Sequence, residues 1–391
     1  MHARVSPRFR PALSRGGRRK ALLAVTVLTG AVMTTGALLP SAASAARPDP
    51  VQKSLNALVT DDKIPAALAS VEDREGRMRH YTAGVGDLRT GAKVPKDGQV
   101  RAGSNTKAFT AVVVLQLVAE KKIALDAPVD TYLPGLLRGE GIDGRHITVR
   151  QLLQHTSGLP EYMESPVFAD FPAVRYRYFE PRDLIDGALA QKAHFSPGAK
   201  WEYSNTNYLV AGLIIQKVTG RPMGEEIDRR IIDRIGLRHT YFPAPGETTI
   251  HEPHPKGYER EAADGPLTDY TNMDMSMAWA AGALVSTNSD LNRFYSALLD
   301  GELLPPAQLA QMRTTVPAEA RGPGVRYGLG LTSTPLSCGG VYWGHGGTAP
   351  GYRTRGGVTE DGRAAGIAVT TAPTGAASQR VEAAVDTALC R

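Results

Sequence analysis

The hydrophobic pattern predicts a chain with strands near both ends and helices between them. Residues 108–118, Ala-Phe-Thr-Ala-Val-Val-Val-Leu-Gln-Leu-Val, form an apolar run that fits a buried helix. Other segments fit helices or short strands bounded by glycine-rich turns. The predicted helices are 51–60, 147–154, 208–218, 288–299 and 381–389, and the predicted strands are 66–71, 78–85, 99–102, 325–332, 339–345, 351–358 and 365–371.

This order of elements predicts an α/β (α+β) fold with one sheet assembled from both ends of the chain. Residues 122–270, which read mostly as helices and loops, would form a helical lobe inserted into the sheet lobe. A cleft is expected where the two parts meet, and Ser104 lies at that junction.

Residues 1–45 have the pattern of a secretory signal peptide. Seven basic residues and no acidic residue precede an apolar stretch at 21–40, and Ala-Ser-Ala at 43–45 is a small-x-small cleavage pattern. The alternative is an uncleaved membrane anchor, because the apolar run is almost long enough to span a bilayer. We expect cleavage, a secreted protein without a stable membrane anchor, and a mature domain over residues 46–391.

The charge balance changes once the signal peptide is set aside. The chain has 45 basic and 39 acidic residues, and removal of residues 1–45 leaves 38 basic and 39 acidic. The positive charge therefore belongs to the signal peptide and gives no support for nucleic-acid binding. In a secreted chain the two cysteines, Cys338 and Cys390, most simply form one disulfide.

Candidate chemistry begins in Gly-Ser-Asn-Thr-Lys at 103–107, just before the apolar helix. Ser104 and Lys107 are three residues apart, so on a helix they lie on one face. Burial at an apolar helix end lowers the pKa of a lysine, and a neutral amine can take the proton of a nearby hydroxyl. The pair therefore predicts an activated serine nucleophile. Taken alone, Ser-x-x-Lys also fits a helix cap followed by a solvated lysine.

Two later segments add weaker signals. Tyr-Ser-Asn at 203–205 lies in a polar loop before the predicted helix 208–218. A tyrosine beside a lysine is expected to lose its proton more easily and to shuttle it to the serine. Gly-His-Gly-Gly-Thr at 344–348 follows a strand, and such an edge can place a backbone N–H against a developing oxyanion. Separately, the two segments also fit a surface loop and a β-bulge.

Together, Ser104-x-x-Lys107, Tyr203-Ser-Asn205 and His345-Gly-Gly resemble the three-motif signature of penicillin-recognising serine enzymes. The chain is similar in particular to the secreted D-alanyl-D-alanine carboxypeptidases/transpeptidases of streptomycete type, which are related to class C β-lactamases. His-Thr-Ser-Gly-Leu at 155–159 and Tyr-Gly-Leu-Gly-Leu at 327–331 are also similar. The resemblance implies a β-lactamase/transpeptidase-like fold, a central antiparallel sheet flanked by helices plus a helical lobe, with no metal or organic cofactor.

The resemblance also implies roles for the matching residues. Ser104 would be the acylated nucleophile, Lys107 its proton partner and Tyr203 a proton relay in acylation and deacylation. Asn205 would hydrogen-bond Lys107 or a substrate amide.

The strand edge after Gly344 would bind the substrate. The backbone N–H groups of Ser104 and Thr348 would form the oxyanion hole, next to Gly346. His345 stands where many relatives have lysine, and it would add electrostatics and contacts at the strand edge.

One position departs from the streptomycete-type pattern. These carboxypeptidases have an arginine just after the strand that here reads Tyr-Gly-Leu-Gly-Leu, and that arginine contacts the free carboxylate of the peptide. Here the residue is Thr332, which supplies no charge. If Thr332 points into the cleft, Thr332→Arg should favour free-acid substrates, and Arg353 and Arg355 are the candidates to compensate.

The leading hypothesis is a monomeric D-alanyl-D-alanine carboxypeptidase/transpeptidase that acts on peptidoglycan stem peptides through an acyl-enzyme on Ser104. β-Lactams would acylate the same serine. A class C-like β-lactamase or an esterase on the same scaffold is the alternative among enzymes. A non-catalytic module that binds β-lactams or cell-wall fragments is the alternative of another class, although the complete set of Ser104, Lys107 and Tyr203 favours an enzyme.

Overall fold

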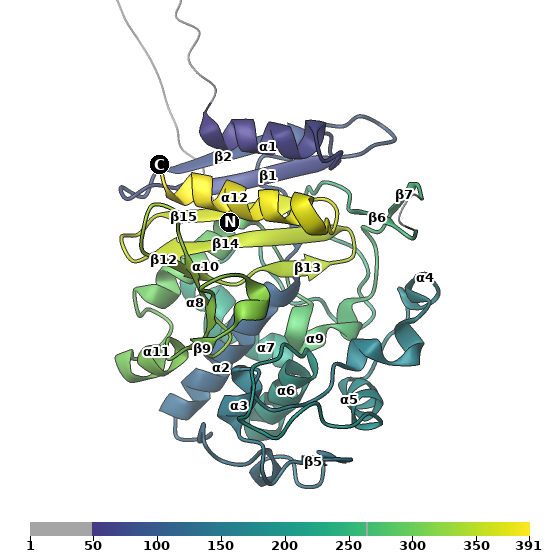
Figure 1. The fold of residues 1–391 in the computed structure, drawn as a ribbon, viewed down its shortest axis with the longest axis vertical. Coiled ribbons are helices and arrows are strands. Elements are labelled where there is room, and N and C mark those ends of the chain that lie inside the picture. The colour runs from purple at the N-terminus through teal and green to yellow at the C-terminus, as the bar shows by residue number, and fades with distance from the viewer. Residues whose placement is uncertain (1–48, 263–264) are drawn as a thin grey trace, which may run out of the picture. The chain divides into compact units, whose positions relative to one another are not determined.

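A computed structural model of the chain describes residues 49–262 and 265–391, so the predicted signal peptide lies outside the described residues. Within them, nine strands form one antiparallel sheet of order β2-β1-β15-β14-β12-β11-β10-β9, and β13 pairs with β14 (Figure 1). Strands from the two ends of the chain meet where β1 pairs with β15, which confirms a sheet assembled from both termini. The nine strands are β1 (Ala66–Glu72), β2 (Met78–Gly84), β9 (Val316–Pro317), β10 (Arg326–Tyr327), β11 (Thr332–Pro335), β12 (Val341–Gly344), β13 (Gly347–Ala349), β14 (Tyr352–Thr359) and β15 (Ala364–Val369).

Helices cover both faces of this sheet. α1 (Pro50–Thr60) and α12 (Gly375–Leu389) share one buried apolar cluster with alternate residues of β1 and β15. α10 (Asn288–Leu299) covers the other face, where the Asn288 amide donates to a carbonyl of β1 at 3.0 Å. Successive side chains of a strand point to opposite faces, and β1 is buried on both, so it packs against a helical layer on each side.

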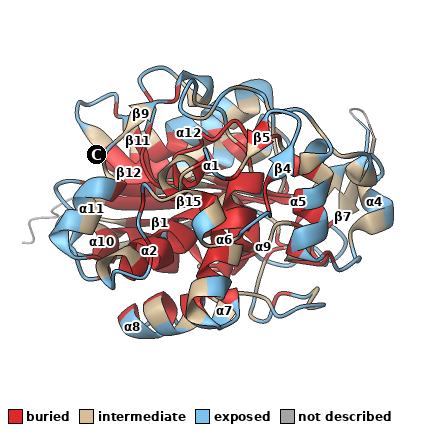
Figure 2. Cartoon of the chain, turned by 90° about the horizontal axis from the view of Figure 1, so that it is seen from below, coloured by how far each residue is buried: buried red, intermediate tan, exposed pale blue. Residues whose placement is uncertain are grey.

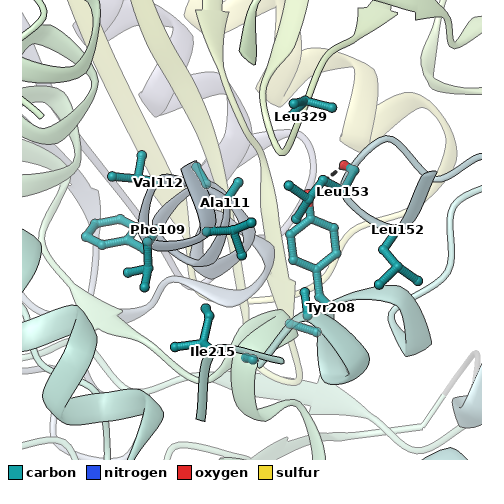
Figure 3. Close-up of a cluster of buried hydrophobic side chains, with 14 of the residues drawn as sticks. Phe109, Ala111, Val112, Leu152, Leu153, Tyr208, Ile215 and Leu329 are labelled. Atoms are coloured by element: carbon teal, nitrogen blue, oxygen red, sulfur yellow. Dashed lines mark hydrogen bonds between the residues drawn. The ribbon is translucent and has the colours of Figure 1, made fainter. Parts of the chain in front are cut away.

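α2 (Thr106–Ala119) is the central helix below the sheet, and all but its last two residues are buried (Figure 2). A helix that is apolar all round has to be covered on every side, and here helices and the sheet surround it. The rings of Phe109 and Phe294 stack at 3.7 Å between α2 and α10. On another side, Tyr208 of α6 (Thr206–Thr219) donates its hydroxyl to the Leu153 carbonyl (Figure 3). This packing fixes the position of the first turn of α2.

The remaining helices and the small strand pairs lie between β2 and β9 in the sequence. None of the helices in the described residues is long and apolar enough to cross a membrane. The remaining helices are α3 (Val149–Leu153), α4 (Phe171–Val174), α5 (Pro181–Leu189), α7 (Met223–Ile227), α8 (Asp233–Ile235), α9 (Trp279–Gly282) and α11 (Pro306–Met312), and the small strand pairs are β3 (Val100–Arg101) with β8 (Val285–Ser286), β4 (Arg138–Gly139) with β5 (Ile142–Asp143), and β6 (Tyr258–Arg260) with β7 (Leu267–Asp269).

Three predicted elements differ from the observed ones. The strand expected at 325–332 is a hairpin, because Gly330 adopts a φ of +74° and reverses the chain between β10 and β11. The strand expected at 99–102 pairs with β8 and not with the main sheet. The last helix begins at Gly375, six residues before the expected start, because its small residues carry no strong apolar signal.

The predicted disulfide is present. Cys338, in the turn between β11 and β12, is bonded to Cys390 at the end of α12, across 52 residues of sequence. Replacing both cysteines by alanine is expected to lower the free energy of unfolding by about 2–4 kcal/mol, because the closed loop restricts the unfolded chain. Denaturant unfolding measures this change. Two titratable thiols in the native wild-type protein would contradict the bond.

Candidate active site

Ser104 lies in a single 3-10 turn, Gly103–Asn105, that leads directly into α2. Its hydroxyl lies 3.0 Å from Lys107 Nζ, so the predicted pair does share one face. Gly103 has a φ of +53°, and a Cβ added there would lie 2.7 Å from the backbone nitrogen of Thr348. Only glycine at position 103 therefore allows the turn that carries Ser104 to approach the edge of β13 so closely.

Lys107 is completely buried, and acceptors surround its amine. Nζ donates to Asn205 Oδ1 at 2.6 Å and to the Ala281 carbonyl at 2.7 Å. Burial lowers the pKa of Lys107 well below its usual value, and Arg321 lowers it further, whereas Glu161 opposes both effects. A neutral amine has two N–H groups and one lone pair. Because the two acceptors use both N–H groups, the lone pair is left for the Ser104 hydroxyl.

Glu161 holds Asn205 in the orientation that this arrangement needs. Glu161 Oε2 accepts from the backbone N–H of Asn205 at 2.7 Å and from its Nδ2 at 2.9 Å. With Nδ2 bound to the carboxylate, Oδ1 has to face Lys107. Glu161 was not recognised in the sequence, where nothing distinguishes it from neighbouring Glu164.

Tyr203 donates its hydroxyl to Ser104 Oγ at 2.8 Å, as the predicted relay requires. The expectation that the tyrosine loses its proton easily was wrong, because burial raises the pKa of Tyr203 to about 12. Its ring packs against the buried ring of His155, with centroids 4.4 Å apart. Tyr203 is therefore a neutral donor to Ser104 Oγ, in line with a serine hydroxyl that donates to Lys107.

His345 does not supply the positive charge that its position suggested. The ring is buried, and burial lowers the pKa of His345 well below its usual value. Nδ1 lies 2.6 Å from the Gly346 carbonyl, which can only accept, so Nε2 is free to accept from the Tyr327 hydroxyl at 3.0 Å. A neutral His345 thus holds the start of β13 in place and adds no electrostatic attraction.

The candidate catalytic residues open onto a cavity of about 670 Å³. Ser104, Tyr203, Asn205, Gly346 and Thr348 all contribute to its lining, so the three motifs do meet in one site. The oxyanion hole from the N–H groups of Ser104 and Thr348 stays a prediction, supported by the close approach of Gly103 to the Thr348 peptide.

The residue expected to depart from the carboxypeptidase pattern does not face this cavity. Thr332 is buried and donates its hydroxyl to the Gly344 carbonyl at 2.7 Å, so Thr332→Arg would not place a charge beside the substrate. Arg353 does not line the cavity either, whereas Arg355 does, with its guanidinium bound to Glu382. Arg321 also lines the cavity and lies over the Tyr203 ring, with its guanidinium carbon 5.2 Å from the centroid.

Glu161→Gln is expected to lower kcat/KM by about tenfold, because glutamine has one acceptor oxygen in place of the two that bind Asn205 and the Met163 N–H. The carboxylate also raises the pKa of Lys107. Its removal should therefore move the acidic limb of the kcat/KM profile to lower pH. Glu164→Gln, at an exposed position three residues away, is the matched control. A lowered rate with an unmoved pH profile would mean that Glu161 is only structural.

Comparison with known proteins agrees with this geometry. The model of the family described as Beta-lactamase matches residues 51–390. The structure of a D-stereospecific amidohydrolase from Streptomyces sp. is 42% identical, with a TM-score of 0.80 over 86% of this chain and 97% of that one. D-amino acid amidase from Ochrobactrum anthropi SV3 is 27% identical, with a TM-score of 0.75 over 87% and 96% of the two chains.

PbpX of Bacillus subtilis (strain 168), which is named as a penicillin-binding protein, is 31% identical over 262 residues. The match covers 67% of this chain and 59% of PbpX, so the chain spans less than two thirds of that relative. The family match over nearly all described residues, together with the serine, lysine and tyrosine in hydrogen-bond contact, identifies a serine acyl-transfer hydrolase. The chain belongs to the beta-lactamase family, within the superfamily of penicillin-recognising serine enzymes.

Proposed function

We propose that the protein is a secreted, D-stereospecific amidohydrolase that cleaves the amide or ester bond after a D-amino acid through an acyl-enzyme on Ser104. The observation that carries the proposal is the buried Lys107 amine, whose two hydrogen-bond acceptors leave its lone pair for the serine. The similarity to the Streptomyces amidohydrolase supports the choice of D-aminoacyl substrates. The predicted signal peptide supports secretion.

The acylation step follows from the hydrogen bonds of the site. Ser104 Oγ attacks the substrate carbonyl carbon while its proton passes to Lys107 Nζ, and the carbonyl oxygen becomes an oxyanion near the N–H groups of Ser104 and Thr348. Tyr203, bound to Oγ, then gives its proton to the leaving nitrogen and regains one from Lys107. The C–N bond breaks, the amine leaves, and the acyl ester stays on Ser104.

Deacylation uses the same groups in reverse. A water molecule takes the place of the leaving amine. Tyr203 accepts one proton from the water while it passes its own to Lys107, and the hydroxide oxygen attacks the ester carbon. The C–O bond to Ser104 breaks, Lys107 returns its proton to Ser104 Oγ, and the acid product leaves. The same acylation route also applies to β-lactams, which we include as ligands of the site.

A paired substrate panel tests the proposal. Hydrolysis of D-phenylalanine amide, D-alanine amide and the matching methyl esters is compared with that of their L-enantiomers, and each reaction is followed by intact-mass spectrometry. We expect turnover of the D-substrates with at least about a hundredfold lower kcat/KM for the L-forms. Equal rates for both enantiomers would reject D-specificity, and penicillin consumption without D-amide turnover would identify a β-lactamase.

One observation favours D-alanyl-D-alanine carboxypeptidase activity as a second candidate. Arg321 lines the cavity that contains Ser104, and among the described residues no carboxylate pairs with it. A guanidinium in this place can bind a substrate carboxylate through charge-assisted hydrogen bonds. Arg321 would thus bind the substrate carboxylate, as an arginine does in the streptomycete-type carboxypeptidases at the position where this chain has Thr332.

Arg321→Gln is expected to lower kcat/KM for free-acid peptides ending in D-alanyl-D-alanine by about tenfold to a hundredfold, because a charge-assisted contact contributes roughly 1.5–3 kcal/mol. The corresponding C-terminal amides should lose far less. Arg326→Gln removes a nearby guanidinium that binds Thr315 outside the cavity, and it serves as the control. Equal losses for acids and amides would mean that Arg321 does not recognise the carboxylate.

A further inference from the structure

A second cavity of about 470 Å³ is lined in part by Trp279 of α9, the short helix whose Ala281 carbonyl accepts from Lys107. Most of its walls are apolar, with Phe179, Leu213, Met223, Phe242 and Trp279 among them. No residue that lines this cavity also lines the catalytic cavity. A largely apolar cavity of this size can enclose a small organic molecule.

The charges at this cavity are mainly negative and only partly neutralised. Glu225 pairs with Arg221, and Arg182 pairs with Asp186. Glu180 and Asp228 also line the cavity, and among the described residues neither forms an ion pair. Glu180 is exposed, whereas Asp228 is partly buried. An apolar chamber beside these two unpaired carboxylates favours a ligand that combines a hydrocarbon body with a cationic group.

Asp228 is a partly buried carboxylate on the cavity wall, and no cationic side chain of the described residues pairs with it. Its side chain is half-buried, and burial together with neighbouring Asp233 raises its pKa to about 6, with no cation acting in the opposite direction. At pH 7 the carboxylate is still mostly ionised and poorly compensated. A ligand ammonium group would supply the counter-charge that the described residues do not provide.

Trp279 connects this cavity to the catalytic centre. It has a φ of +33°, a conformation that residues other than glycine rarely adopt. Its ring fills the space beside Gly212, where an added Cβ would lie 2.6 Å from the ring. Two residues later, the Ala281 carbonyl accepts the hydrogen bond from Lys107. The wall of the cavity is thus the same short helix that holds the catalytic amine.

We propose that this cavity is a second ligand site, distinct from the catalytic cleft, that binds small primary amines carrying one aromatic or branched apolar group. The apolar group would lie against Phe242 and Trp279, and the ammonium group would pair with Asp228 and Glu180. The site is independent of which acyl substrate the enzyme hydrolyses.

Calorimetric titration of the full chain with 2-phenylethylamine tests the proposal, with 2-phenylethanol as the uncharged comparison. We expect saturable binding of the amine and at least about tenfold weaker binding of the alcohol, which corresponds to one charge-assisted contact. The double variant Asp228→Asn, Glu180→Gln should weaken amine binding by a similar factor. Glu259→Gln, which removes a carboxylate from the catalytic cavity, should leave binding unchanged.

A second variant tests the same cavity without changing any charge. Leu213→Trp places a larger side chain on the cavity wall and should abolish binding, while thermal unfolding reports whether the variant is folded. Loss of binding in Glu259→Gln with full binding in the double variant would place the amine in the catalytic cleft and overturn the proposal. Absence of saturable binding to the wild type at millimolar concentrations would also overturn it.

Discussion

Ser104→Ala is expected to lower kcat/KM by about 10⁴-fold or more and to prevent any covalent acyl adduct, because the variant has no oxygen to attack the substrate. Intact-mass spectrometry with a D-aminoacyl ester or a penicillin measures the adduct directly. The fold should persist, because Asn205 and Ala281 still accept hydrogen bonds from Lys107 in the variant.

Ser54→Ala provides the matched control, since this serine lies on α1 and its hydroxyl bonds only the backbone of its own helix. It should retain full activity and full labelling. Covalent labelling of Ser104→Ala at the wild-type rate would remove this serine from the mechanism. Loss of cooperative thermal unfolding in Ser104→Ala would mean that the lost activity results from misfolding. Mass labelling of the folded fraction would then show whether the folded variant can still form an acyl adduct.

Lys107→Met is expected to lower kcat/KM by about 10²- to 10⁴-fold, which is the usual contribution of a positioned general base. Methionine approximates the length and shape of the lysine stem but has no basic nitrogen. Because burial lowers the pKa of Lys107, the amine is neutral over a wider pH range than an exposed lysine.

The pH profile separates a base from a structural lysine. The active form is the neutral amine, so the kcat/KM of the wild type should rise with pH as Lys107 loses its proton and then level off. This rise should lie well below the usual lysine pKa of 10.5, and it should be absent from the residual activity of Lys107→Met. A wild-type profile that falls over this range, or a variant that keeps the same rising limb, would contradict the role of Lys107.

Local signals in the sequence were sufficient for several features. The all-round apolar run after Lys107 predicted a covered helix, and α2 is buried along nearly its whole length. Helical spacing placed Ser104 beside Lys107, because neighbours on one helix face are fixed by backbone geometry. The cysteine count predicted one bond, and Cys338 and Cys390 form it.

Protonation state and side-chain direction depend on surrounding groups and could not be predicted from local signals. Tyr203 was expected to lose its proton readily, yet burial raises its pKa to about 12. His345 was expected to add electrostatics as well as contacts at the strand edge, yet burial lowers its pKa and keeps the ring neutral. Burial is contributed by segments far away in sequence, so a local motif cannot report it. A local motif also cannot report which way a side chain points. Strand pairing directs the Thr332 hydroxyl to the Gly344 carbonyl and away from the cavity.

The sequence by itself therefore indicated the family, through the resemblance of its three motifs, and placed Ser104 beside Lys107. It also predicted most strands and helices, because these follow from local spacing and hydrophobic period. Only the tertiary structure decided which atoms control the chemistry. Glu161, Ala281 and Arg321 come from three segments without a recognisable motif, and folding brings them around Lys107. Their effect is electrostatic and acts through space, so it depends on distances that exist only after the chain has folded.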